Sequence, residues 1–224
     1  MLIAQKLLQA LATPQHLMGE VLIETNAANN RFILFHEADL ALAGSSSFGG
    51  LMVYDGPGAA REIASYAQDG SYRFLKGQLN LRRGWVMRLA CVEDLRLALD
   101  QFYPACVGLW LAQQDGTLEV THLRDTLQRQ SGMYRRAQAL SDAALQSLVP
   151  GTCAAAIPCA RRILWQLDAH TPLLPSPASR CNGTPNDGTP SAAIPLLCRE
   201  ACNHFVAQCL AAATAKTAAA PQVG

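Results

Sequence analysis

Segments with the character of β-strands lie in the first half of this 224-residue chain and end near residue 120. The strand-like runs are short, turn residues bound them, and amphipathic helical patterns lie between them. Beyond that point only helical patterns and a linker follow. The chain is therefore predicted to have an α+β fold, with a small N-terminal hairpin or sheet plus helices, followed by a helical half rich in cysteine. The expected regions are 1–120, 121–216 and a disordered tail at 217–224.

The first region should contain a β-hairpin, because Val21–Glu24 and Phe32–His36 flank an Asn-rich turn. The glycine-rich stretch 44–58 has neither a Walker-type ending nor a GxGxxG order, so we expect a mobile loop rather than a phosphate site. His36, Glu37 and Asp39 are expected to form a solvated strand end. Further predicted elements are helices at 2–11, 59–68 and 92–103 and strands at 85–89 and 116–123.

The second region is predicted to be helical wherever it is not linker. Ser141 or Asp142 should cap the helix that continues to about residue 149. Proline, serine, glycine, asparagine and threonine are dense between residues 171 and 193, which is typical of an exposed linker. Other predicted helices cover residues 124–129, 133–140, 159–170 and 194–210.

Charge and hydropathy exclude several classes of protein. The formal net charge is +1 and only 16% of the residues are charged, so no basic field is available for nucleic acid. No apolar run is long enough to span a bilayer, and no basic segment precedes the apolar N-terminus as in a secretory signal. We therefore expect a cytoplasmic protein that binds neither nucleic acid nor membrane. In that compartment the eight cysteines should be packing residues, metal ligands or reactive thiols rather than disulfides.

Two pairs of cysteines lie where proline suggests a helix start. Cys198 and Cys202 are four residues apart, which would place both thiols on one face of a helix that begins near Pro195. Cys153 and Cys159 form the second pair, and Cys159 would open the next predicted helix. A helix N-terminus favours thiolate over thiol, so two such ends could converge on an anionic cluster held by four thiolates.

The spacing alone leaves an iron-sulfur cluster, zinc and plain buried thiols open. Five and three residues separate the members of the two pairs, which matches neither a ferredoxin run nor the tight knuckles of zinc sites. The remaining cysteines have simpler explanations, although two of them, Cys106 and Cys181, could replace one of the four ligands. Cys91 and Cys209 are expected in the core, Cys106 packs near a helix break, and Cys181 lies in the linker.

Four segments resemble the iron-sulfur domain, with its stabilising region, found at the C-terminus of CbiX-type sirohydrochlorin chelatase proteins. They are YRFLKGQLNLRRGW, LRLALDQFYPAC, RQSGMYRRAQALSD and PLLCREACNHFVA, and the resemblance runs from about residue 19 to residue 212. It implies a 4Fe-4S cluster, and the cysteines that match the family pattern are Cys153, Cys159, Cys198 and Cys202.

The resemblance implies an electron carrier or accessory subunit linked to tetrapyrrole metabolism, that of sirohaem or cobalamin. No chelatase domain precedes the hairpin, so the expected partner is a redox protein or a chelatase-type enzyme acting in trans. Two alternatives remain. The first is an interaction module without redox activity, stabilised by zinc on the four cysteines, and the second is an enzyme whose cluster binds substrate directly. Whether the chain is itself an enzyme stays open.

Overall fold

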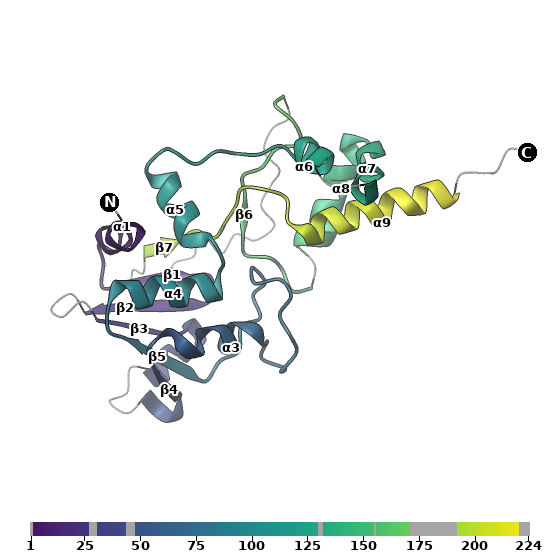
Figure 1. Cartoon of the computed structure of the whole chain (residues 1–224). Helices are drawn as coiled ribbons and strands as arrows, with labels where there is room; N and C mark the ends of the chain where they lie inside the picture. Colours follow the sequence, from purple (N-terminus) through teal and green to yellow (C-terminus); the bar gives the residue numbers. More distant parts are fainter. Residues whose placement is uncertain are drawn as a thin grey trace, which may run out of the picture. The chain divides into compact units, whose positions relative to one another are not determined.

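A computed structural model describes residues 2–26, 31–43, 48–129, 132–154, 156–170 and 192–219 of the chain. Two compact units are present, one made of residues 1–118 and 179–196 and the other of residues 119–178 and 197–224. The first contains a mixed sheet with helices, and the second is mainly helical, which confirms the α+β prediction (Figure 1).

The first unit is built on a six-stranded sheet with the order β4-β5-β3-β2-β1-β7. The predicted hairpin is confirmed, because β2 and β3 pair antiparallel from Val21 opposite His36 to Asn26 opposite Arg31. The predicted strand at 85–89 is confirmed as β5, which pairs antiparallel with β3 and parallel with β4. The strands are β1 (Gln15–Met18), β2 (Val21–Asn26), β3 (Arg31–His36), β4 (Met52–Asp55), β5 (Trp85–Leu89) and β7 (Ala192–Ile194).

Helix α4 packs on this sheet through an apolar stripe (Figure 1). Leu95, Leu99 and Phe102 are fully buried, and the Phe102 ring stacks on Trp85 with 5.0 Å between the ring centroids. Pro104 follows the helix, as predicted, since proline cannot continue the hydrogen-bond ladder. The helices of the unit are α1 (Ile3–Ala10), α2 (Leu40–Ala43), α3 (Ala60–Ser65), α4 (Val92–Phe102) and α5 (Cys106–Gln114), with 3-10 turns η1 (Glu37–Asp39), η2 (Phe48–Gly50) and η3 (Pro57–Ala59).

Two secondary-structure predictions for this half were wrong. The glycine-rich stretch is not simply a loop, because residues 52–55 form β4 at the edge of the sheet; residues 44–47 lie outside the described part. The segment 116–123 forms no strand, and its one pairing in the described chain is an isolated bridge between His122 and Gln166. Val120 is 43% exposed there, so the alternating pattern does not mark a buried sheet face.

The second unit packs its helices around a core that includes Leu127, Leu145, Trp165 and Phe205. Ser141 caps α8 as predicted, since its hydroxyl accepts a hydrogen bond from the backbone N–H of Ala144. The elements are α6 (Leu123–Arg129), α7 (Gly132–Arg135), η4 (Ala137–Ala139), α8 (Asp142–Cys153), α9 (Asn203–Ala219) and a small parallel sheet of β6 (Arg162–Ile163) and β8 (Leu197–Cys198).

The helix predicted at 159–170 is absent, and the one predicted at 194–210 is present only from Asn203. Residues 162–163 instead pair with residues 197–198 as β6 and β8, and α9 begins only at Asn203. The residue before a proline avoids the helical region, so Ile194 is extended and ends β7. The alanine-rich sequence carries α9 to Ala219, so residues 217–219 of the expected tail are helical.

Candidate metal centre

All four predicted cysteine ligands belong to the second unit, but they come from different elements than expected. Cys153 is the last residue of α8, and Cys159 lies in the extended chain before β6. Cys198 ends β8, and Cys202 directly precedes α9. Cys198 and Cys202 therefore do not share a helix face, and only Cys202 stands at a helix N-terminus.

Backbone hydrogen bonds fix the positions of these residues. The N–H of Cys159 donates to the carbonyl of Cys153 at 2.8 Å and closes the loop between them. The carbonyl of Cys198 accepts the N–H of Leu164 at 3.0 Å, which extends the pairing of the two short strands. The Cys202 carbonyl accepts from Val206 at 3.0 Å in the first turn of α9. The backbone that carries these thiols is thus held in place by hydrogen bonds.

The four sulfurs lie close enough to influence one another's ionisation. The pKa of the Cys153 thiol is raised to about 12, mainly by burial and then by the charges of Cys159, Cys202 and Cys198, in that order. Burial also raises the pKa of Cys198 to about 11, with Cys202 and Cys159 adding to the effect. Because charge interactions fall off with distance, these mutual effects indicate that all four sulfurs gather in one region.

The chemistry of this donor set fits an iron-sulfur cluster. Iron-sulfur clusters are held by cysteine thiolates, commonly four, and here Cys159, Cys202 and Cys198 all lie near enough to Cys153 to raise its pKa. The partial positive charge of the α9 N-terminus, next to Cys202, favours an anionic group. Arg161 lowers the pKa of Cys198, which indicates a positive charge close to that sulfur. Cys153 stands at the C-terminus of α8, so it gains no such help from its helix.

Three of these thiols are half-buried and Cys202 is exposed. None of the described cysteines is in a disulfide, as predicted. Within the described residues, no three His, Cys, Asp or Glu side chains are arranged at the distances of a single-ion site.

The other cysteines have different surroundings. Cys209 is fully buried in the core of the second unit, as predicted, and burial raises its thiol pKa to about 11. Cys106 is fully buried at the start of α5 in the first unit, which agrees with a packing role. Cys91 is half-buried at the residue before α4 rather than in the core. Cys181 lies outside the described residues.

Sequence reasoning missed Trp165, which the predicted helix at 159–170 treated as one apolar position among several. Its side chain is 1% exposed, its indole nitrogen is buried, and Cys153 and Cys198 pack against the core that contains it. The strand pairing that brings Trp165 to Cys198 joins segments far apart in the chain. No local pattern in the sequence could have identified this contact.

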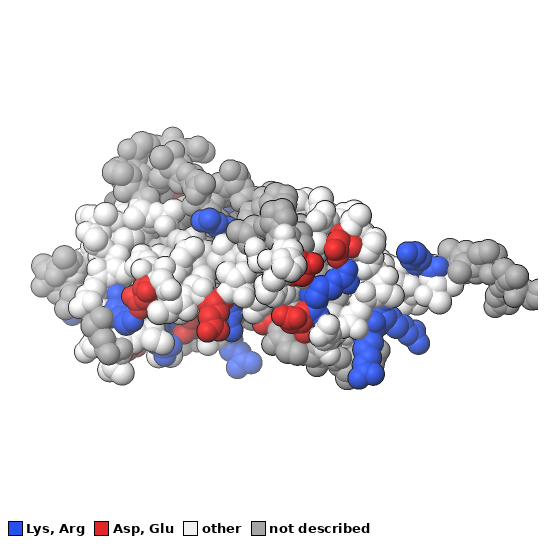
Figure 2. Space-filling view, turned by 90° about the horizontal axis from the view of Figure 1, so that it is seen from above, with Lys and Arg blue, Asp and Glu red and all other residues white. Residues whose placement is uncertain are grey.

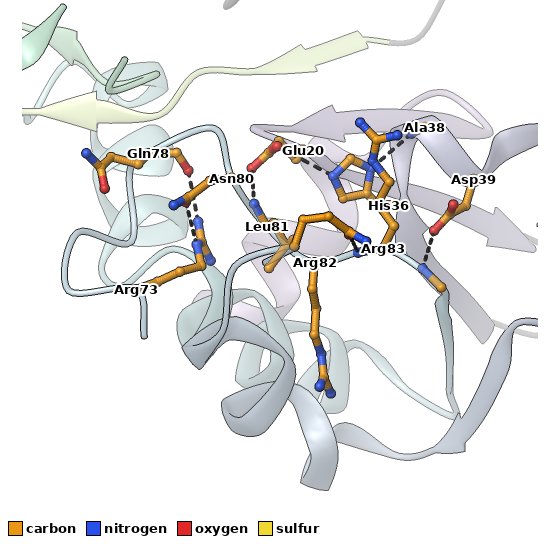
Figure 3. Close-up of polar contacts among 12 residues, drawn as sticks. Glu20, His36, Ala38, Asp39, Arg73, Gln78, Asn80, Leu81, Arg82 and Arg83 are labelled. Atoms are coloured by element: carbon orange, nitrogen blue, oxygen red, sulfur yellow. Dashed lines mark hydrogen bonds and ion pairs between the residues drawn. The ribbon is translucent and has the colours of Figure 1, made fainter. Parts of the chain in front are cut away.

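A second polar cluster lies in the first unit, where a solvated strand end was predicted (Figure 3). His36 is only 2% exposed, and its Nε2 is 3.5 Å from Oε1 of Glu20. The other Glu20 oxygen accepts the backbone N–H of Leu81 at 2.9 Å, and Asp39 Oδ2 accepts that of Gly84 at 2.7 Å. The prediction failed because the segment at 81–84 covers the strand end. The cluster ties that segment to the hairpin.

Two further features concern the surface and the helices. Basic and acidic side chains are interspersed on the face shown in Figure 2. Among the described residues, no helix combines the length and apolar character that crossing a membrane requires.

Comparisons with known proteins match the two halves of the chain to two different families. Residues 4–114 match the family model of the DR2241 stabilising domain, and residues 115–210 match that of a 4Fe-4S iron-sulfur cluster binding domain. Among curated proteins the chain has no match.

Among solved structures, a protein that is similar over most of the chain illustrates the whole arrangement. It is DR2241 from Deinococcus radiodurans, described as a multi-domain protein with structural similarity to chelatases and two additional novel domains. The TM-score is 0.72 at 25% sequence identity, and the match covers 95% of this chain. The chain spans 41% of the length of that protein.

Proposed function

We propose that the chain carries a 4Fe-4S cluster on Cys153, Cys159, Cys198 and Cys202, because residues 115–210 match a 4Fe-4S iron-sulfur cluster binding domain and residues 4–114 the stabilising domain that precedes it. We further propose that it acts as an electron carrier or accessory subunit for an enzyme of tetrapyrrole metabolism. The ligand assignment is supported by the mutual influence of these thiols, since Cys159, Cys202 and Cys198 each raise the pKa of Cys153.

When bound, such a cluster can take up and release single electrons. The residues of the chain would hold it and set its surroundings. The raised pKa values of Cys153 and Cys198 mean that both lose protons when they become ligands, so cluster binding is coupled to proton release. The charge of Arg161 and the N-terminus of α9 then offset the negative charge gathered at the four sulfurs.

The accessory role is supported by the make-up of the similar protein, which combines a chelatase-like part with its additional domains. This chain corresponds to less than half of that protein. We propose that a chelatase-type enzyme, or a redox protein that serves one, binds it in trans.

Metal analysis of anaerobically purified protein tests the cofactor and its ligands. We expect about four iron and four sulfide ions per chain and visible absorbance that bleaches on reduction. Alanine at any of the four proposed ligands should remove most of the iron, whereas Cys209→Ala and Cys91→Ala should retain it. Colourless protein with stoichiometric zinc would favour the zinc-stabilised interaction module instead.

The partner is tested by titrating cluster-loaded protein with a purified chelatase-type enzyme in a calorimeter. Saturable binding that is weakened in the cluster-free Cys198→Ala variant would support the accessory role. A change in the cluster spectrum when a tetrapyrrole is added without any enzyme would favour the alternative in which the cluster binds substrate directly. Absence of both results would contradict the proposed link to tetrapyrrole metabolism.

A further inference from the structure

The indole of Trp165 is a buried hydrogen-bond donor without an ordinary partner. The side chain is 1% exposed, and its Nε1 makes no hydrogen bond of normal length to any described residue. Nearly all buried polar groups in proteins are hydrogen-bonded, because an unpaired N–H loses its water contacts without compensation. A buried N–H without a partner therefore suggests that its acceptor forms only when the protein binds its cofactor.

The main chain holds Trp165 firmly beside Cys198. Ile163 pairs with Cys198 across the small parallel sheet, and the next residue, Leu164, donates its N–H to the Cys198 carbonyl at 3.0 Å. On the other side, Gln166 hydrogen-bonds to the backbone of Thr121. Trp165 is thus fixed by backbone hydrogen bonds on both sides.

The indole ring is also fixed by packing. It lies 5.2 Å from the ring of Phe205, centroid to centroid, and Phe205 is itself 1% exposed on α9. The indole side chain already interacts with the Cys198 thiol and lowers its pKa against the larger effect of burial. A donor held this rigidly loses little conformational freedom when it forms a hydrogen bond.

We infer that the indole N–H of Trp165 donates a hydrogen bond to the sulfur of Cys198 in the cluster-loaded protein and raises the reduction potential of the cluster. The Cys198 thiol donates to the carbonyl of Glu200, with 3.2 Å between sulfur and oxygen. Ligation removes that proton and leaves a sulfur that can only accept. The neutral N–H of Trp165 is then a donor already in place.

The direction of the effect follows from electrostatics. Reduction adds an electron to the cluster and makes its thiolate sulfurs more negative, so a hydrogen bond to sulfur is stronger in the reduced state. A donor that stabilises the reduced state more than the oxidised state raises the potential, and hydrogen bonds to sulfur are among the established determinants of cluster potentials. Trp165 is accordingly a positioning and tuning residue and not a ligand.

This inference rests on the proposed ligand Cys198, and the experiment separates the two. The full-length protein is purified anaerobically as wild type, Trp165→Phe, Phe205→Leu and Trp85→Phe, and the midpoint potential is measured by spectroelectrochemical titration alongside the iron content. Trp165→Phe should keep about four iron ions per chain and show a lower potential. Phe205→Leu disturbs the same packing but keeps the indole, and Trp85→Phe removes a buried indole from the other unit, so both should keep the wild-type potential.

A shape-preserving replacement guards against disruption of the core. β-(3-benzothienyl)alanine at position 165 retains the bicyclic ring but has sulfur in place of the N–H, and it should lower the potential as Trp165→Phe does. A wild-type potential in this protein, loss of its iron, or an equal shift in Phe205→Leu would overturn the inference. If Cys198→Ala retains its iron, the proposed ligand set fails instead, whatever Trp165 does.

Discussion

Replacing Glu20 by alanine should destabilise the first unit strongly, although Glu20 is remote in sequence from the groups that it binds. The carboxylate is 6% exposed and is the acceptor for the Leu81 N–H and the partner of His36. Alanine would leave the Leu81 N–H buried without its carboxylate acceptor. A buried donor left without its partner costs roughly 1–3 kcal/mol. With a urea m-value of about 2 kcal/mol/M, the unfolding midpoint should fall by roughly 0.5–1.5 M.

Urea titration of the protein, followed by fluorescence and by hydrogen exchange in peptides that contain β5, measures this loss. Glu20→Gln keeps an amide oxygen for Leu81 and should lose about half as much stability. The exposed pair of Asp55 and Arg88 is the matched control, because Asp55 is 75% and Arg88 51% exposed and Asp55→Ala should leave the midpoint almost unchanged. If Glu20→Ala shifts the midpoint no more than Asp55→Ala, the buried network does not stabilise the unit as argued.

Three further predictions concern the cluster region, acid stability and a backbone constraint. Cys202→Ala should lose most of its iron and increase hydrogen exchange in α9, whereas Cys209→Ala should keep its iron and cost only about 1 kcal/mol in urea unfolding; equal iron loss in both variants would contradict the ligand assignment. Burial lowers the pKa of His16 below 6.5, so the unfolded protein binds a proton more readily and stability should fall as the pH drops below 6.5. The melting temperature of His16→Gln should fall less over the same pH range. An equal dependence of melting temperature on pH in wild type and variant would refute this explanation. Gly19 has φ +62° and a Cβ there would overlap the Tyr103 hydroxyl, so Gly19→Ala should cost more than the roughly 1–2 kcal/mol of left-handed backbone alone; a melting temperature equal to that of the wild type would contradict it.

Elements with a clear local period were predictable from the sequence. In the hairpin of β2 and β3, in strand β5 and in helix α4, apolar residues recur at the spacing typical of a strand or of a helix. The apolar side chains of each element are the ones buried in the first unit. The Ser141 cap was predictable for a similar reason, because the cap bond is made within a few residues of the chain.

The elements around the cysteines could not be predicted in this way. Residues 162–163 and 197–198 are strands only because they pair with each other across a long stretch of chain, and this pairing overrides the helical pattern of each segment. The grouping of the four cysteines could nevertheless be proposed from the sequence, because four thiols in one half of the chain suggest a common role whatever elements hold them. The burial of His36 was missed for the same reason as the strands, since the covering segment begins at Leu81.

The parallel pairing of β1 with β7 has a consequence for how such a gene can be rearranged. Residues 16–18 lie opposite residues 192–194, so the sheet of the first unit is completed by a strand encoded after most of the cluster region. A recombination breakpoint near residue 115, where the two matched families meet, would separate these strands and leave β1 as an unprotected sheet edge prone to association. The regions 4–114 and 115–210 are therefore expected to be inherited and lost together rather than exchanged separately between proteins.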